Sequence, residues 1–312
     1  MNRQHLGFGI GAAVVALVVA HVDGQRPRGQ NETPPEVVQA TVDNPVPARP
    51  APVPSKTWTP KRRPDGQPDV EGGLWGAVGP GTHNPLENPT GGAKPVPSRI
   101  SDPPDGRVPY RSEAAARRKQ HAYDRDHPTR PEHIDTQQRC LYAPPRMAYG
   151  TEQYRLIQPP GYIVFVYNRN HEYRVVPVAP EHYPTPGPRL KTWMGFSRGR
   201  WEGNTLVIEN VNHRGILLTS LGDFVTDKTR FTERYQFIDA DTINWEVTID
   251  DPSVFTRPWT MRVPHKRGKD IQGNQGGEGA GDEFWEEPCW EGTSEVEHKL
   301  FDNLFGRKGA SR

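Results

Sequence analysis

A single carboxylate interrupts an apolar row in the stretch RFTERYQFIDADTINWEVTID, which runs from Arg230 to Asp250. The stretch predicts two strands and a tight turn, and alternation places Glu233 on the same face as Phe231, Tyr235 and Phe237. If that face is buried, the carboxylate must be paired with a cation or have a raised pKa. With a raised pKa, the glutamate is a usable general acid or base near neutrality. In an ion pair with an arginine, its role is structural.

The cationic candidates for that pairing are Arg174, Arg257 and Arg262. In NRNHEYR, His171 lies close to Arg174 at a predicted strand turn, where it can bind a polar group, move a proton or be merely solvated. If the protein is an enzyme, Glu233 or His171 is the expected base. Arg174 or Arg257 then stabilises developing negative charge.

Tryptophans gather in the same part of the chain and can either stack on a ligand or fill the core. A pocket in this region is expected to be lined by Trp201, Trp245 and Trp259, next to Tyr235. Glu233 and an arginine, Arg174 or Arg257, would orient a polar group of the ligand.

Motifs for phosphate, dinucleotide or zinc chemistry are absent from the sequence. His127 and His133 in HPTRPEH have a spacing that fits no compact metal site, and the prolines break any helix that would align them. We therefore predict neither a metal nor a cofactor.

These candidate residues lie on a chain segment whose hydrophobic period is two from Gly161 onward. Strands are predicted in GYIVFVY, EYRVVPV, GRWEGNTLVIENVN, TRFTERYQFID, TINWEVTID and RPWTMRVP, with an earlier one at Leu74 and Trp75 and a last one in FWEEPC. Short turns such as Gly203-Asn204 make them an antiparallel meander, and such sheets close into small barrels to remove their edges. The predicted fold is mainly β, a lipocalin-like barrel or strongly curved sheet.

Two helices are predicted beside this barrel. PYRSEAAARRKQHAYDR forms one helix, which Ser112 can cap and which lies across the surface. SEVEHKLFDNLFG carries Val296, Leu300, Leu304 and Phe305 on one stripe and forms a C-terminal amphipathic helix.

The N-terminus predicts export. Arg3 precedes an uncharged run from Leu6 to Ala20, which is too short to span the ~30 Å hydrocarbon core of a bilayer and is typical of a secretory signal. We expect cleavage after Ala20 or as late as Gly24, with an uncleaved anchor as the alternative. Residues 21–68, rich in proline, form an extended spacer, and residues 69–312 form a single β-rich domain. The expected location is periplasmic or secreted.

The net charge limits which partners are expected, and the cysteine content indicates a disulfide. Removal of Met1–Ala20 leaves 38 basic and 38 acidic residues, which gives no electrostatic reason to expect nucleic acid or an anionic membrane. The two cysteines, Cys140 and Cys289, stand 149 positions apart, and in an exported protein such a pair most simply forms one disulfide. Two buried thiols are the alternative.

Six motifs occur in an order that resembles a known family: PDVEGGLWG, SDPPDGRVPY, RCLYAPPRM, WMGFSRGRWEGNTLVIENVN, TERYQFIDADTINWEVTIDDPSVFTRPWTMRVP and CWEG. The chain from about Asp69 to Gly292 resembles a large group of exported, functionally uncharacterised β-rich proteins of soil bacteria, especially acidobacteria and proteobacteria. The resemblance implies export and a β-rich core and supplies no activity. Gly73-Leu74-Trp75 is also similar to the Gly-x-Trp signature that opens lipocalin barrels.

This chain departs from the family pattern at two places. APEHYPTPGP follows the strand EYRVVPV where the family usually has Asp-Gly-Arg-Pro-His, and Trp290 follows the last cysteine where the family often has His. A functional role that the family's residues have at those two sites is therefore not expected in this chain.

These observations predict an exported β-barrel that binds a small apolar or amphipathic molecule without a cofactor. One alternative is a cofactor-free hydrolase, lyase or isomerase that acts on a small extracellular metabolite. A second is a cell-envelope interaction module whose barrel is fully packed and whose proline-rich arm contacts a partner. The sequence does not distinguish an enzyme from a binding protein.

Overall fold

The computed structural model describes residues 46–56, 58–79, 85–88, 96–141, 143–150, 153–170, 172–179, 186–268, 284 and 295–305. These residues belong to one compact unit. The predicted signal segment, His171, Cys289 and all of the predicted strand FWEEPC except Phe284 lie outside them.

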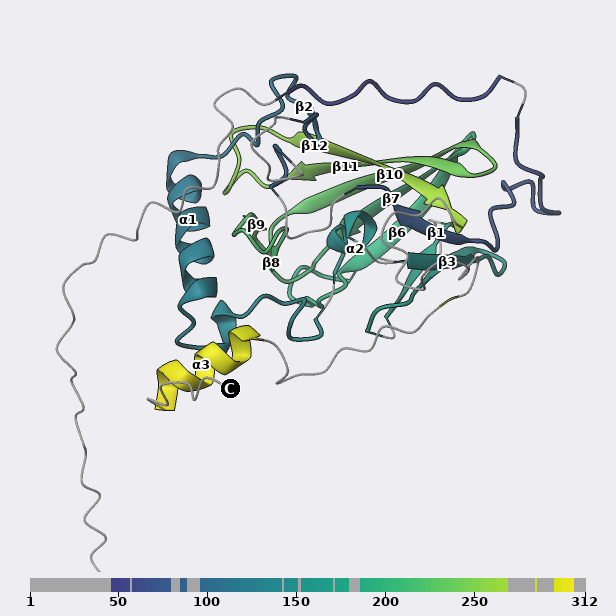
Figure 1. Ribbon diagram of the computed structural model, residues 1–312. Helices are drawn as coiled ribbons and strands as arrows, with labels where there is room; N and C mark the ends of the chain where they lie inside the picture. Colours follow the sequence, from purple (N-terminus) through teal and green to yellow (C-terminus); the bar gives the residue numbers. More distant parts are fainter. Residues whose placement is uncertain are drawn as a thin grey trace, which may run out of the picture. The chain divides into compact units, whose positions relative to one another are not determined.

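One antiparallel sheet dominates the structure, and it is nearly closed into a barrel (Figure 1). Its strand order is β5-β4-β3-β1-β12-β11-β10-β7-β6, with β2 paired to β12. The strands are β1 (Leu74–Ala77), β2 (Ile100–Asp102), β3 (Gln153–Ile157), β4 (Tyr162–Tyr167), β5 (Tyr173–Pro177), β6 (Phe196–Glu202), β7 (Thr205–Val211), β10 (Arg230–Asp239), β11 (Thr242–Asp250) and β12 (Trp259–Arg267). The predicted fold class is therefore confirmed.

Short turns set the register of the meander, as the sequence predicts. The residues between β6 and β7 are Gly203 and Asn204, and Gly203 has a φ of 62°. Only a residue that tolerates positive φ suits such a turn, so glycine is favoured there. β10 and β11 pair from Arg230↔Asp250 to Asp239↔Thr242, with one bulge near the turn. Burial alternates along the hairpin away from its turn, which gives the barrel its buried face.

The barrel closes where the two edge strands, β5 and β6, meet through side chains. Arg174 Nε on β5 donates to Ser197 Oγ on β6 at 2.9 Å. A Cβ at Gly199 on β6 would lie 2.9 Å from a methyl carbon of both Val176 and Val178. Side-chain contact thus joins the edges in place of a hydrogen-bonded ladder.

The inward face of the barrel is filled by large side chains. Its buried members come from β1, β3, β4, β7, β10, β11 and β12 and include Trp75, Tyr154, Phe165, Leu206, Phe231, Tyr235, Trp245, Val247, Trp259 and Met261, all with at most 1 % of their surface exposed. α2 (Arg146–Tyr149) is buried at the barrel, and the ring of its Tyr149 lies 6.0 Å from that of Trp245. The interior is thus a core that side chains pack.

Helices and a small hairpin lie beside the barrel. They are α1 (Ser112–Asp126), the 3₁₀ turn η1 (Pro131–His133), the two-stranded sheet of β8 (Ile216–Leu217) and β9 (Phe224–Val225), and α3 (Glu295–Phe305). α1 packs so closely on Gly222 that a Cβ there would lie 2.4 Å from the carbonyl oxygen of Arg118. Ser112 is the first helical residue and makes no capping hydrogen bond, so the expected cap is not found.

The C-terminal helix is where the sequence predicts it. Leu300 is buried, Leu304 is 49 % exposed, and Asn303 Nδ2 donates to the carbonyl oxygen of Pro128 at 2.8 Å. Among the residues that the structure describes, no helix is long and apolar enough to cross a bilayer.

Part of the predicted proline-rich spacer contacts the barrel. Val46 forms an isolated parallel bridge with Pro97, and the backbone N–H of Ser55 donates to the carbonyl oxygen of Ile238 at 3.1 Å. Trp58 packs against the hydrophobic core. The described residues of this segment thus add to the packed unit.

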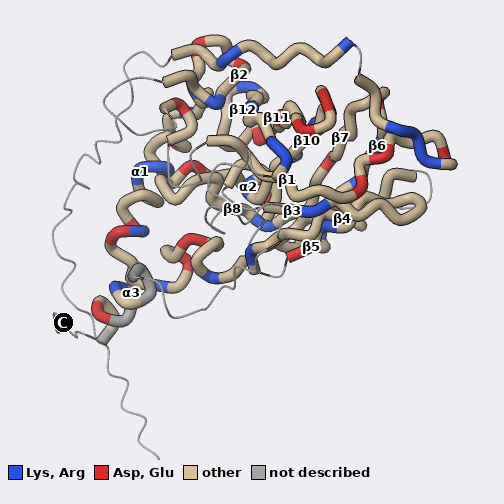
Figure 2. Tube along the Cα trace, turned by 45° about the vertical axis from the view of Figure 1, so that its right-hand side comes forward, with Lys and Arg blue, Asp and Glu red and all other residues tan. Residues whose placement is uncertain are grey.

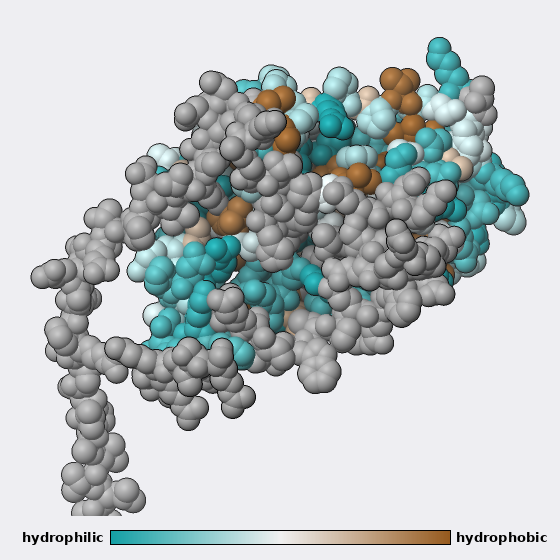
Figure 3. All heavy atoms as spheres, in the orientation of Figure 1, coloured by the Kyte–Doolittle hydropathy of each residue, from teal (hydrophilic) through white to brown (hydrophobic). Residues whose placement is uncertain are grey.

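The surface carries both signs of charge. Basic and acidic segments are both scattered over the described elements (Figure 2). On the face shown in Figure 3, hydrophobic residues form small separate groups among hydrophilic ones.

Candidate functional site

Glu233 lies inside the barrel and is paired with a cation, as its place in an apolar row predicts. Its side chain is completely buried, and Arg174 Nη2 lies 2.7 Å from its Oε1. Tyr235 Oη donates to Oε2 at 3.1 Å, and Trp245 Nε1 donates to the same oxygen at 3.3 Å. Both carboxylate oxygens are therefore satisfied by neighbouring side chains.

The electrostatics of this group follow from burial and from the pair itself. Burial alone would lower the pKa of the Arg174 guanidinium, but the adjacent Glu233 carboxylate raises it above its ordinary value. Burial, with the Glu233 charge adding to it, raises the pKa of Tyr235 well above its ordinary value. Arg174 is therefore charged and Tyr235 neutral across the physiological range.

Two further predicted ligand residues have different surroundings. Trp259 is fully buried against Phe255, with 5.4 Å between ring centroids. Trp201 is half-buried at one end of the barrel, where its Nε1 donates to Gln67 Oε1 at 3.1 Å.

The remaining predicted site residues do not join Glu233. Arg257 forms an exposed ion pair with Asp102, and Arg262 Nε lies 2.6 Å from Glu246 Oε1. His171, the alternative base, lies outside the described residues. So does Cys289, and its disulfide with Cys140 stays a prediction.

The structure contains a cleft of about 660 Å³ at a different place, beside the barrel. Its walls are α1, η1, the turn that follows η1, the segment before β6, and the hairpin of β8 and β9. The side chains on these walls are Arg117, His121, Asp124, Glu132, His133, Ile134, Thr136, Arg139, Arg189, Lys191, Trp193, Arg214, Ile216, Leu217, Phe224, Val225, Thr226 and Asp227.

One wall of the cleft is a face of α1 laid over Phe224. Arg117 and His121 stand one helical turn apart and so share a face. The Arg117 guanidinium lies 4.6 Å and the His121 ring 5.0 Å from the centroid of the Phe224 ring. Burial, with the Arg117 charge adding to it, lowers the pKa of His121. His121 is therefore neutral at pH 7, and Phe224 with Ile216 and Val225 provides an apolar floor.

The opposite wall centres on Trp193. Residues 192 and 213 form a parallel bridge, in which the Arg214 N–H donates to the Thr192 carbonyl oxygen at 2.9 Å. This pairing sets Trp193 beside Arg214, whose guanidinium lies 5.4 Å from the Trp193 ring centroid. The Arg139 guanidinium lies 6.0 Å from the same centroid.

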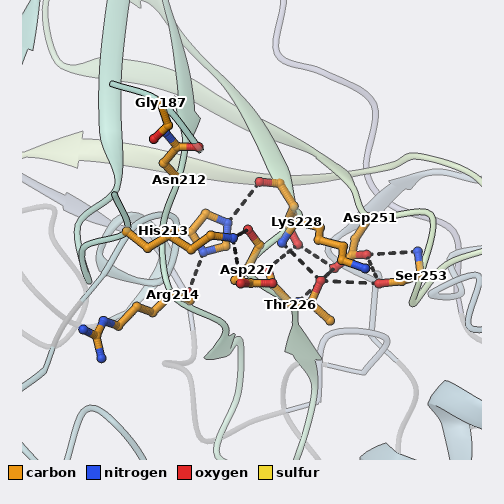
Figure 4. Close-up of polar contacts among 11 residues, drawn as sticks. Gly187, Asn212, His213, Arg214, Thr226, Asp227, Lys228, Asp251 and Ser253 are labelled. Atoms are coloured by element: carbon orange, nitrogen blue, oxygen red, sulfur yellow. Dashed lines mark hydrogen bonds and ion pairs between the residues drawn. The ribbon is translucent and has the colours of Figure 1, made fainter. Parts of the chain in front are cut away.

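A buried polar cluster holds the chain around Arg214 (Figure 4). His213 is fully buried, with Nδ1 2.6 Å from the Arg214 carbonyl oxygen and Nε2 3.2 Å from the Thr229 carbonyl oxygen. Asp251 accepts hydrogen bonds from Thr226, Thr229 and Ser253. In Figure 4 the Arg214 side chain points away from this cluster, so it remains free to face the cleft.

The turn that carries Arg139 is fixed by a second buried ion pair. Asp135 accepts two bonds from Arg146, at 2.5 Å and 2.7 Å, and both side chains are buried. Arg146 Nη1 also donates to the Leu217 carbonyl oxygen at 3.3 Å, which ties the turn to β8. The backbone N–H of Arg139 donates to the carbonyl oxygens of Asp135 and Thr136. Arg139 is thus presented by a rigid turn.

Sequence reasoning found the buried Glu233 group and missed the cleft. Its walls come from segments that show no period, and β8 and β9 are only two residues each. The one signal of the cleft in the sequence was Trp193 with arginines before and after it along the chain. Without the fold, this pattern does not indicate a binding site. Among the described residues, no group of three or more metal-ligating side chains is found.

Comparison with protein-family models, with curated proteins and with solved structures finds no match to this chain.

Proposed function

We propose that this protein binds a small amphipathic molecule in the cleft between α1, the β8–β9 hairpin and Trp193. The observation that carries this proposal is a cleft of about 660 Å³ with an apolar floor and polar walls. Small-molecule sites have volumes of about 300–1,000 Å³, and a few polar groups in them fix the orientation of the ligand.

The walls of this cleft are held in place before a ligand enters. The Asp135–Arg146 pair fixes the turn before Cys140, and the His213 and Asp251 cluster fixes the chain around Arg214. Preorganised walls favour binding because less side-chain and loop freedom is lost when the ligand binds.

The proposed site differs in place from the barrel interior. Trp245, Trp259 and Tyr235 are almost completely buried, which leaves no water-sized space beside them. The Arg174–Glu233 pair also has its hydrogen bonds satisfied within the protein. An enzyme that uses Glu233 as its base needs a substrate to reach that side chain, and 0 % exposure offers no approach. His171, the other expected base, lies outside the described residues.

We also propose that the protein is exported to the periplasm or secreted and belongs with the exported β-rich proteins that its motifs resemble. The support is the uncharged run from Leu6 to Ala20 behind Arg3. N-terminal sequencing of protein from fractionated cells tests this: a start near His21 or Gln25 in the periplasm or medium agrees. A retained Met1 in the membrane fraction would indicate the uncleaved anchor, and protein found in the cytoplasm with Met1 would contradict export.

Binding is tested with the neutral fluorescent probe N-phenyl-1-naphthylamine and by native mass spectrometry of protein purified from its own periplasm. We expect saturable 1:1 binding of the probe and a retained small molecule in the mass spectrum. Trp193→Ala should weaken probe binding by about tenfold or more, since it removes an aromatic wall of the cleft.

Trp201→Ala is the matched control. Trp201 is also a half-buried tryptophan, but it lies at the end of the barrel beside Phe237 and not in the cleft. Its substitution should leave probe affinity unchanged. An effect of Trp201→Ala without one of Trp193→Ala would move the site to the barrel end. Absence of both a bound probe and a retained molecule would contradict the proposed function.

A further inference from the structure

We infer that the ligand of the cleft is an aromatic anion, whose acidic group is bound by Arg139 and Arg214 next to Trp193. This inference rests on the proposed function and adds the chemical class of the ligand. Carboxylates, sulfonates and phosphates share the required chemistry: a planar or tetrahedral group of oxygen acceptors.

The charges of the cleft favour an anion. Five lysines and arginines line it against three acidic residues, and Lys191 Nζ is already paired with Asp227 Oδ2 at 2.6 Å. The other basic side chains are Arg117, Arg139, Arg189 and Arg214, and the other acidic ones are Asp124 and Glu132. The excess of positive charge lies in a cleft open to solvent, whose protein walls strengthen its field relative to bulk water.

The two arginines beside Trp193 have no carboxylate partner among the described residues. Their guanidinium groups lie 6.0 Å and 5.4 Å from the centre of one indole ring, so two like charges share a single aromatic wall. A ligand anion between them would offset this repulsion. Its ring would meet the apolar floor around Phe224 and Ile216.

Arg139 also carries an unsatisfied donor. Its Nε is buried and has no hydrogen-bond partner among the residues that the structure describes. Buried donors are nearly always paired, and leaving one unpaired is costly. The turn that presents Arg139 is fixed by Asp135 and Arg146, so its side chain starts from a defined place at the cleft wall. Since Nε itself is buried, the acidic group of the ligand would contact the outer nitrogens of this guanidinium.

The test compares two fluorescent probes of nearly the same shape. 8-Anilinonaphthalene-1-sulfonate carries a sulfonate, and N-phenyl-1-naphthylamine lacks it. We expect the sulfonate to bind about tenfold or more tightly, and its advantage to shrink as salt rises from 0.05 to 0.5 M because of screening. Arg139→Gln and Arg214→Gln should each remove most of that advantage and leave the affinity for the neutral probe unchanged.

Arg200→Gln is the control, since Arg200 lies on β6, away from the cleft, in exposed ion pairs with Glu202 and Glu209. Near-ultraviolet circular dichroism checks that each variant keeps its packing. Equal affinity for the two probes would overturn this inference and leave the proposed function standing. An advantage that survives both cleft substitutions would also overturn it. Failure of both probes to bind would contradict the proposed function itself.

Discussion

Arg174 and Glu233 form an ion pair inside the barrel, 2.7 Å apart, although they lie 59 positions apart in the sequence. Arg174 also reaches Ser197 across the junction between the edge strands β5 and β6. A single side chain therefore connects the buried carboxylate to the place where the barrel closes. The pair thus has a clear structural role, which is to hold the two edges of the sheet together.

Arg174→Met should destabilise the protein by about 3–5 kcal/mol, because it leaves the Glu233 carboxylate buried without a cation. The free energy of unfolding, from urea titration, measures this. Adding Glu233→Gln to Arg174→Met should recover part of the loss, since the remaining group is neutral. Arg200→Met is the control: its ion pairs are exposed, so its effect should stay below about 1 kcal/mol. Equal effects of the two arginine substitutions would contradict the importance of the buried pair.

Gly199→Ala tests the closure of the barrel independently of charge. The added methyl group would meet Val176 and Val178 at 2.9 Å, so β5 and β6 must move apart. We expect a loss of about 1–3 kcal/mol, the usual cost of overpacking a core. Gly187→Ala is the control, because a Cβ there has no neighbour within 4 Å. Urea titration measures the free energy of unfolding of both variants. If Gly199→Ala leaves that free energy unchanged, the edge strands β5 and β6 are not in contact.

Stability should fall as the pH drops below about 6.5, and His265 should contribute to the fall. Its ring is completely buried between Tyr154 and Trp245, and burial lowers its pKa to about 3. The folded pKa is below the unfolded value of 6.5, so the unfolded chain takes up the proton first. The free energy of unfolding should thus decrease by up to about 1.4 kcal/mol per pH unit between roughly pH 6 and pH 4 from this group.

His265→Gln removes this ionisation and should flatten the dependence of stability on pH over that range. The measurement is urea unfolding at several pH values between 4 and 7. His127→Gln is the control, because His127 is exposed and stacks on Tyr123 at the surface. An unchanged slope in His265→Gln would show that other groups cause the acid destabilisation.

The predicted disulfide between Cys140 and Cys289 should leave no reactive thiol in the unfolded, unreduced protein. A thiol reagent in denaturant, with and without prior reduction, measures this, and two thiols should appear only after reduction. Closing a loop of about 150 residues should stabilise the fold by roughly 4–5 kcal/mol in the chain-entropy model. Cys140→Ser should show a loss of that order, and two reactive thiols before reduction would contradict the pairing.

The sequence predicts the long strands from β4 onward, because one face of each is buried, but it does not predict β2 or β3. It also predicts that Glu233, if buried, is either paired with a cation or has a raised pKa, and the structure shows the pairing. The sequence does not distinguish Arg174 from Arg257 and Arg262, since this choice depends on which strands meet when the sheet curves. The cleft is equally beyond the sequence, because Arg139, Trp193 and Arg214 are brought together by a parallel bridge and a turn without any shared period.

Edge strands of β-sheets invite other chains to pair with them. β5 has only five residues, ends at Pro177, and turns the charge of Arg174 inward. Short length, a proline and an inward charge each make an edge unsuitable for strand addition. The strand β5, whose Arg174 closes the barrel, therefore also protects the sheet edge from pairing with a second copy of the chain. This should keep the protein free of fibrous aggregates at high concentration.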